Sequence, residues 1–244
     1  MRSQMFGIPH SGADVCGYKG NDALDEELCL RWYQLATFFP LARHSQSSEG
    51  PRTEPFMFKT YMNQVKKTMH DRMQYLRLMY TCLFETTING GTCLDPLEFL
   101  FNVPADKQTW GGQSSKTFMF AGKLKVSPIL NATNGQTTFQ SYFPSGLWVN
   151  MADFSEHING NDDMQTLQVR DTVNVHLAPG ALISFQDNSD MSIMTTQDAL
   201  KKPIMLVINR EQDSKSAQGT LFLDQGVSKA EIDNEDWEYY RIYA

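Results

Sequence analysis

The period at which apolar residues recur changes once along this chain, near Gly91, and that change limits the folds open to it. Before Gly91, apolar side chains recur at steps of three and four from Phe58 to Leu83, the period of one helical face. Pro55 suits the first turn of such a helix, and glycines at 90 and 91 end it. After Gly91, strand-like runs alternate with glycine and proline turns, at residues 117–120, 124–130, 137–143, 167–177, 181–185, 204–208 and 220–223. We therefore predict one long helix, followed by a β-sandwich or two small β-domains.

The first fifty residues follow a different pattern. Residues 5–8 form a short apolar run that predicts a strand, and Gly12 lets the chain turn where a side chain would block it. Residues 24–35 are typical of a helix that opens with acids, residues 38–42 of a second strand, and residues 45–53 of a polar loop. Asp14 lies just past the first predicted strand. In a parallel α/β barrel, the loops that follow the strands build the active site.

Composition excludes some partners. The 244 residues carry a net charge of −7 at pH 7, which argues against nucleic acid, because its binding needs clustered Lys and Arg. No run of eighteen apolar residues occurs, so we expect no membrane span, and the N-terminal residues lack the apolar region of a signal peptide. We expect no metal site and no cofactor, because the chain has no CxxC motif, scattered histidines and no phosphate-binding loop.

The four cysteines fall as two close pairs, Cys16 with Cys29 and Cys82 with Cys93. An even count in paired spacing favours disulfides in an oxidising compartment, whereas four reduced, partly buried thiols explain the same pattern equally well. Asn131 begins the triplet Asn-Ala-Thr, a glycosylation sequon, although such triplets also arise by chance. The residues by themselves leave both questions open.

The segment most specific to one family lies before residue 44. Residues 6–18 read FGIPHSGADVCGY, and residues 20–40 read GNDALDEELCLRWYQLATFFP. This stretch resembles the retaining α-glucosidases of glycoside hydrolase family 31, in particular the maltase and lysosomal acid α-glucosidase branch, which carries GADxCGF, then GN, then ELCxRWxQLGAFYPF. A weaker likeness continues in KVSP (residues 125–128), YFP (142–144), DTVNVH (171–176) and LFLDQG (221–226).

The resemblance implies an α/β plus all-β fold. We expect the last strands and the closing helix of a (β/α)8 barrel, followed by C-terminal β-sandwich domains. The expected divisions are the C-terminal end of the catalytic barrel with its closing helix in residues 1–88, a proximal β-sandwich domain in residues 89–186, and a distal, incomplete β-domain in residues 187–244.

The resemblance also implies the C-terminal part of a retaining α-glucosidase that hydrolyses terminal α-linked glucose from oligosaccharides. The expected partner is therefore an α-glucoside or a glycan. Such enzymes use a nucleophile and an acid/base, two carboxyl groups about 5 Å apart. In the family these groups lie in WxDMNE-like and WxGDN-like motifs on earlier segments, and neither motif occurs here. We therefore expect no catalytic residue in this chain, no activity from it alone, and a missing N-terminal barrel half that is supplied in cis or in trans.

Through the resemblance, five residues are candidates for binding the sugar: Asp14, Tyr18, Arg43, His44 and Ser45. Asp14 matches an aspartate that accepts hydrogen bonds from hydroxyls of the terminal sugar, and the alternative is an aspartate that stabilises its own turn. Tyr18 matches an aromatic residue of the same pocket, and packing under the loop is the alternative. The family's RNHN motif stands here as RHSQ from Arg43, so Ser45 takes the place of the family histidine and His44 comes one residue early. Because a shift of one residue on a strand reverses the side chain, either the loop slips or the pocket has lost a donor.

The matching branch bridges the positions of Cys16 and Cys29, so the resemblance implies that disulfide. It implies nothing comparable for Cys82 and Cys93. Together with glycosylation at Asn131, this disulfide indicates a protein of the secretory pathway, either lysosomal or extracellular.

Several family residues are replaced in this chain. The family's RPL appears as Asp95-Pro96-Leu97, which reverses a charge, and its LLPY appears as Leu76-Arg77-Leu78-Met79. Such departures favour an alternative function, that of a catalytically inactive relative that binds glycans or serves as a structural or interaction protein.

Overall fold

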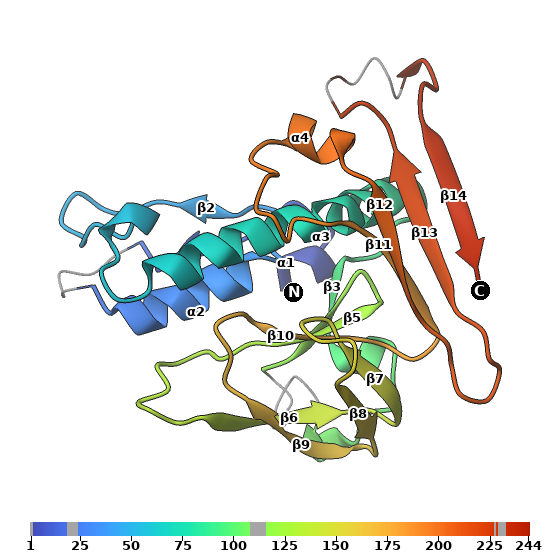
Figure 1. Cartoon of the computed structure of the whole chain (residues 1–244), viewed down its shortest axis with the longest axis horizontal. Helices are drawn as coiled ribbons and strands as arrows, with labels where there is room; N and C mark the ends of the chain where they lie inside the picture. Colours follow the sequence, from blue (N-terminus) through green and yellow to red (C-terminus); the bar gives the residue numbers. More distant parts are fainter. Residues whose placement is uncertain (1, 19–23, 108–115, 227, 229–232) are drawn as a thin grey trace.

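A long helix, α3 (Met62–Asn89), crosses the computed structural model of the chain, with α2 (Glu26–Ala36) along one side. One group of strands lies below α3 and a four-stranded sheet crosses its far end (Figure 1). The structure describes residues 2–18, 24–107, 116–226, 228 and 233–244. The described residues also include two short helices and three single 3-10 turns: α1 (Arg2–Met5), α4 (Thr196–Lys201), Pro55–Met57, Leu97–Phe99 and Ala105–Lys107.

Within the described residues, the strands form four sets. Near the N-terminus, a parallel pair joins β1 (Asp14–Val15) to β2 (Arg43–His44). The largest sheet is antiparallel, in the order β3 (Leu94–Asp95), β4 (Phe118–Phe120), β5 (Leu124–Ser127), β10 (Asn174–Leu177), β7 (Gly146–Asn150) and β8 (His157–Gly160). A separate antiparallel ribbon pairs β6 (Thr138–Phe143) with β9 (Asp163–Gln168). The four-stranded sheet has the order β12 (Ile204–Asn209), β11 (Ala181–Gln186), β13 (Gln218–Leu223) and β14 (Glu238–Tyr243).

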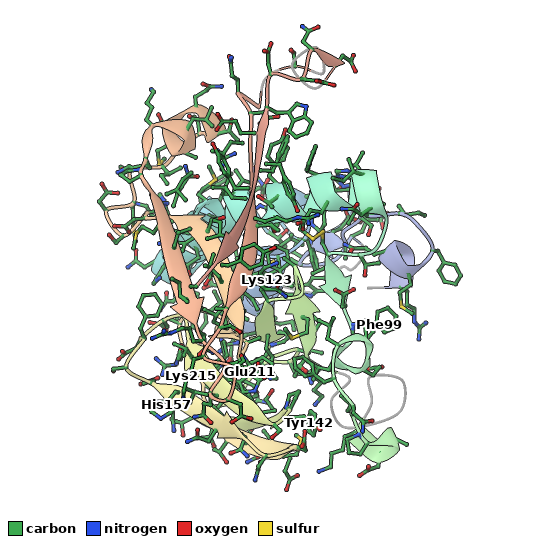
Figure 2. The ribbon with its side chains drawn as sticks, turned by 90° about the vertical axis from the view of Figure 1, so that its right-hand side faces the viewer. Phe99, Lys123, Tyr142, His157, Glu211 and Lys215 are labelled. Carbon is green, nitrogen blue, oxygen red and sulfur yellow. A yellow bond between two sulfur atoms is a disulfide. The ribbon has the colours of Figure 1, made fainter. Side chains whose placement is uncertain are left out.

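The main hydrophobic core lies between α3, the six-stranded sheet and the β6–β9 ribbon. It contains Leu78 and Met79 from α3, Phe120 from β4 and Trp148 from β7. Phe143 on the ribbon packs edge-on against Trp148, with ring centroids 5.8 Å apart. In the view turned by 90° (Figure 2), the β6 and β8 residues Tyr142 and His157 lie at the end of the molecule away from α4. This sandwich-like packing after an α/β beginning is the fold class that the sequence predicts.

Helix α3 begins later than the apolar pattern predicts. Pro55 opens a single 3-10 turn, and Phe58 then takes an extended conformation with φ −69° and ψ 133°, so the α-helix starts only at Met62. Phe58 is nevertheless buried, which explains why it continues the apolar pattern. At the other end Gly90 has a positive φ of 72° and its N–H donates to the carbonyl of Thr86 at 3.0 Å. The predicted glycine stop is confirmed.

Two predicted strands of the N-terminal segment are wrong. Met5 is the last residue of helix α1, and residues 6 and 7 form the turn after it. Gln4 anchors this helix, because it is buried and accepts hydrogen bonds from the N–H groups of Cys93 and Leu94 at 2.8 and 2.9 Å. Residues 38–42 are not a strand either, since Phe38 turns into the main core after α2. Buried contacts with distant residues therefore override the local strand preference of both runs.

The strand pattern also differs at two places in the β-rich part. The single run predicted for residues 167–177 is two strands, β9 and β10, which belong to different sheets. Strand β11 pairs with β12 and β13, so the expected division after residue 186 separates β11 from its hydrogen-bonded partners. The three-part domain division stays a prediction.

Helix α2 is joined to the β-rich part by two polar residues of its RWYQ segment. The buried Arg31 donates from Nη1 to the carbonyl of Arg170 at 3.4 Å, and Gln34 donates from Nε2 to the carbonyl of Asp171 at 2.8 Å. The motif therefore fixes the N-terminal segment to the loop before β10. Across the described part of the chain, no helix is both long enough and apolar enough to cross a membrane.

Candidate functional site

Strands β1 and β2 bring Asp14 and Arg43 side by side. The two residues are register partners, and both Nε and Nη2 of Arg43 lie 2.9 Å from Oδ1 of Asp14. The side chain of Asp14 is 23% exposed and that of Arg43 is 61% exposed. Solvent therefore reaches a carboxylate that is held from one side by a guanidinium.

The chain on both sides of Asp14 is constrained in three ways. Cys16 forms a disulfide with Cys29 on α2, which is the bridge that the resemblance implies. Cys16 and Gly17 both have positive φ, 68° and 85°, so the chain turns sharply here. Before the strand, a Cβ on Gly12 would overlap the carbonyl of Leu41, which confirms that a side chain would block this position. These constraints fix the direction of Asp14.

A second disulfide joins Cys82, in the last turns of α3, to Cys93, just before β3. The sequence alone does not decide whether Cys82 and Cys93 form a disulfide. Both sulfurs belong to buried residues, and the bridge ties the end of α3 to the first strand of the large sheet. All four cysteines are therefore paired in the structure.

His44 contacts Thr53 rather than Asp14. It is the register partner of the buried Val15, and its Nε2 makes a short contact with Oγ1 of Thr53. The carbonyl of Thr53 accepts a hydrogen bond from the hydroxyl of Tyr33 at 3.2 Å. Burial, and to a lesser extent Glu54, raises the pKa of Tyr33 to about 12, so this hydroxyl stays a donor near neutral pH. Thr53 was missed by the sequence analysis, because nothing local marks it and only the return of loop 45–53 brings it to His44.

The alternation of side chains along an extended strand favours Ser45 as the neighbour of Asp14. Asp14 and Arg43 share one face of the strand pair, and His44 takes the other. Ser45 follows His44 and is partly exposed. The strand register turns His44 away from Asp14, and the residue that takes the position of the family histidine stays a prediction.

Tyr18 lies at the end of the same loop. Its side chain is 47% exposed, so it does not pack fully under the loop. Its carbonyl accepts a hydrogen bond from the N–H of Ser47 at 2.8 Å, which joins the loop after β1 to the loop after β2. The GN part of the motif, at residues 20 and 21, lies outside the described residues.

The sequon at Asn131 is on the surface. Asn131 is exposed, while the N–H of Thr133 donates to Oε1 of Glu27 at 2.9 Å and its hydroxyl contacts the same oxygen. Burial raises the pKa of Glu27, but the hydrogen bonds from Thr133 and Arg31 outweigh it and leave that pKa below its ordinary value. The sequon asparagine therefore points to solvent from a loop that α2 holds in place.

The arrangement of Asp14 and Arg43 suits binding of hydroxyl groups. The carboxylate accepts hydrogen bonds and the guanidinium donates them, which matches a polyol. Retaining hydrolysis requires a second carboxyl group roughly 5 Å away, whereas the partner of Asp14 here is a cation. Within the part of the chain that the structure describes, no three His, Cys, Asp or Glu side chains come together where they could hold a metal ion.

Two family models match the chain. Residues 1–82 match the TIM-barrel domain of glycosyl hydrolases family 31, and residues 90–183 match the C-terminal domain of the same family. Helices α1 and α2, most of α3 and the parallel strand pair thus correspond to a barrel end, and the large sheet to the domain that follows it.

Individual relatives point the same way. The chain is 33% identical over 240 residues to an alpha-glucosidase of Hordeum vulgare, covering 98% of this chain and 26% of that protein. It is 30% identical to the lysosomal alpha-glucosidase of Rattus norvegicus, covering 93% and 25%. The crystal structure of a glucosidase II alpha subunit superimposes with a TM-score of 0.82 at 22% identity, covering 99% of this chain and 25% of that one. The chain therefore spans about a quarter of the length of the proteins it matches.

Proposed function

Because the chain belongs to glycoside hydrolase family 31, we propose that it forms one wall of the sugar site of a retaining α-glucosidase. This enzyme hydrolyses terminal α-linked glucose from oligosaccharides. The observation that carries the proposal is the Asp14–Arg43 pair, whose residues begin the two parallel strands β1 and β2, next to a loop that a disulfide fixes.

In this proposal Asp14 accepts hydrogen bonds from hydroxyls of the terminal glucose. Arg43 holds the carboxylate from one side and leaves its other oxygen, Oδ2, for the sugar. Ser45 directly follows β2, and Tyr18 ends the loop after β1. His44 acts indirectly, by fixing β2 against Thr53.

The nucleophile and the acid/base come from a barrel segment with the two carboxylate motifs that this sequence lacks. That segment completes the barrel in cis or in trans. Support comes from the lengths, since the matched relatives are about four times longer than this chain. The two disulfides, the exposed sequon at Asn131 and the likeness to a lysosomal enzyme support a place in the secretory pathway.

The test is substitution of Asp14 in the complete enzyme. Loss of a charged partner to sugar hydroxyls costs on the order of 1.5–3 kcal/mol, so Asp14→Ala should lower kcat/KM for an aryl α-glucoside at least tenfold. Asp213→Ala, on the exposed surface, is the matched control and should leave kcat/KM unchanged. Equal kcat/KM values for Asp14→Ala and the control would show that the sugar does not bind at Asp14.

One observation favours a second function, glycan binding without hydrolysis. Ser45 stands in place of a family histidine, and the structure brings no histidine to that face of β2. If the complete protein binds α-glucosides in calorimetry but shows no turnover, and Ser45→His does not raise turnover, the binding function replaces the enzymatic one.

A further inference from the structure

A cavity of about 380 Å³ lies between α3, the loop after β7, the start of β10 and the segment that joins β11 to α4. In Figure 1, α3 runs between α4 above it and β10 below it. None of the lining residues belongs to β1 or β2, so the cavity shares no residue with the Asp14–Arg43 pair. The volume falls within the range of ligand sites, roughly 300–1,000 Å³.

Hydrogen bonds hold the walls of this cavity in place. The side chain of Asn188 donates from Nδ2 to the carbonyl of His70 at 3.3 Å, and its Oδ1 accepts from the N–H of Ile193 at 2.7 Å. These bonds tie the segment after β11 to α3. On the other side, the N–H of Met151 donates to the carbonyl of Val175 at 2.9 Å. The cavity is therefore a preformed part of the fold.

Two side chains of α3 form a polar edge of the cavity. Asp71 accepts a hydrogen bond at Oδ1 from Nζ of Lys67 at 2.9 Å, and its side chain is 18% exposed. Gln74, three residues further along α3, is partly exposed, and its amide has no hydrogen-bond partner among the described residues. Neither Oδ2 of Asp71 nor the amide of Gln74 is sealed from solvent. A ligand in the cavity can therefore reach a carboxylate oxygen and an amide side by side.

The carboxylate of Asp71 lies in a setting poor in water. Burial raises its pKa, while the ion pair with Lys67 acts against that shift. A hydrogen bond formed in such a setting is stronger than one in bulk water. Asp71 is thus well suited to accept hydrogen bonds from hydroxyl groups.

The remaining lining is mostly apolar and carries no unpaired charge. Met151, Val173 and Met191 line the cavity and are each at least partly exposed, with Met191 39% exposed. The two charged side chains, Lys67 and Asp71, neutralise each other. The cavity therefore combines apolar surface with hydrogen-bonding groups of no net charge.

We propose that this cavity binds a pyranose ring of a neutral glycan. Adjacent hydroxyls of the ring donate to Oδ2 of Asp71 and accept from Nε2 of Gln74, and the C–H face of the ring packs against Val173 and Met191. A simple anion would meet the carboxylate of Asp71, with the one ammonium group, on Lys67, already paired. A hydrocarbon would leave the carboxylate and the amide without partners. A sugar ring offers both hydroxyl groups and C–H surface, and so matches both parts of the lining.

The cavity lies on the side of α3 opposite the exposed apolar face of that helix. Met62 and Met69 are 46% and 49% exposed. Asp71 follows Met69 by two residues, so it points about 200° round the helix from it, at about 100° per residue. A further barrel segment that buries Met62 and Met69 therefore leaves the cavity open.

The test is titration calorimetry on the complete protein in its Asp14→Ala form, in which the proposed Asp14 site is weakened. We expect saturable binding of methyl α-D-glucopyranoside. Adding Asp71→Ala should weaken this binding at least tenfold, and adding Gln74→Ala about threefold or more, because a hydrogen bond to a charged group contributes more than one to a neutral amide. Gln197→Ala, at an exposed position of α4, is the matched control and should leave the binding unchanged.

A second ligand keeps the proposal testable if a variant fails to fold. Methyl α-D-glucuronide, which has the same ring and an added carboxylate, should bind at least tenfold more weakly, because it brings a second anion to Asp71. Absence of saturable glucoside binding would overturn the proposal, as would equal binding with and without Asp71→Ala and Gln74→Ala, or equal binding of the two ligands. None of these results bears on the proposed function, whose own test is the kcat/KM of Asp14→Ala.

Discussion

Lys125 on β5 and His176 on β10 lie opposite each other in the six-stranded sheet, and both side chains are buried. Nζ of Lys125 donates to Oγ of Ser127 and of Ser141, at 2.6 and 2.8 Å. Burial alone places the pKa of Lys125 well below its ordinary value. Burial, then the charges of Lys125 and Arg170, lower the pKa of His176 to about 3. Two buried bases in one core make the stability of this sheet depend on pH.

The direction of that dependence follows from the proton bound by the unfolded chain. Unfolded His176 has a pKa near 6.5 and the folded one near 3, so the unfolded state binds more protons between these values. Its contribution to stability is therefore complete above pH 6.5 and is lost as the pH falls towards 3. We expect about 2 kcal/mol less unfolding free energy at pH 5 than at pH 7 from this residue.

His176→Leu should remove the part of the decrease in unfolding free energy between pH 7 and pH 5 that comes from His176. Denaturant unfolding at the two pH values measures this decrease. Exposed His157 provides the matched control, and His157→Leu should keep the full difference between the two pH values. An unchanged difference in the His176 variant would show that His176 titrates normally in the folded protein.

At this scale the sequence predicts residues well where one contiguous motif specifies them. Asp14, Gly12 and Cys16 belong to such a motif, and their local geometry follows from residue chemistry. The partners Thr53 of His44 and Ser141 of Lys125 could not be predicted, because each is brought in by the register of a distant strand or the return of a loop.

Among the elements, the disulfide between Cys16 and Cys29 has the clearest function, since it clamps the loop after β1 to α2. Closing a loop of this length stabilises a protein by about 3 kcal/mol in the chain-entropy model. The double variant Cys16→Ser with Cys29→Ser should lower the unfolding free energy by about that amount and raise KM for the glucoside. Cys82→Ser with Cys93→Ser is the control: it should lower stability and leave KM unchanged. A double variant at Cys16 and Cys29 with unaltered stability and KM would contradict this account.

The strands were predictable where apolar and aromatic residues recur within a short run, as in β5, β6, β11 and β12. The short polar strand β8 and the charged edge strand β14 gave no such signal, since partner strands define them. The break between β9 and β10 could not be predicted either. Residues 167–177 form one strand-like run in the sequence, although β9 and β10 belong to different sheets. Pairing with distant strands thus decides what the local period leaves undetermined.

For the molecule as a whole, the N-terminal segment carries exposed apolar side chains beside an incomplete set of barrel strands. Two strands of two residues each cannot close a barrel. Close to these strands in the sequence, Phe6 is 85% exposed, and Ile8 and Leu41 are exposed as well. The segment has a small core of its own around Leu30 and Phe58, and the β-rich part shares a larger core with α3. In the proposed function, the remaining barrel strands cover the exposed apolar side chains of the N-terminal segment.

The 244 residues expressed alone should therefore bind a hydrophobic dye and aggregate, because unpaired strand edges and apolar side chains remain in water. Dye fluorescence and light scattering measure both effects. The same residues joined to a barrel segment that carries both carboxylate motifs are the comparison and should bind less dye per mole. A sharp, reversible, monomeric melt of the whole chain without dye binding would contradict the prediction.

The central claim is that this chain contributes substrate binding, and that another segment contributes the chemistry. The most direct measurement is turnover of an aryl α-glucoside by the 244 residues alone, and by the same residues joined to a barrel segment that carries both carboxylate motifs. The account predicts no turnover by the chain alone, turnover by the joined protein, and its reduction at least tenfold by Asp14→Ala. Turnover by the isolated chain that survives Asp14→Ala would contradict it.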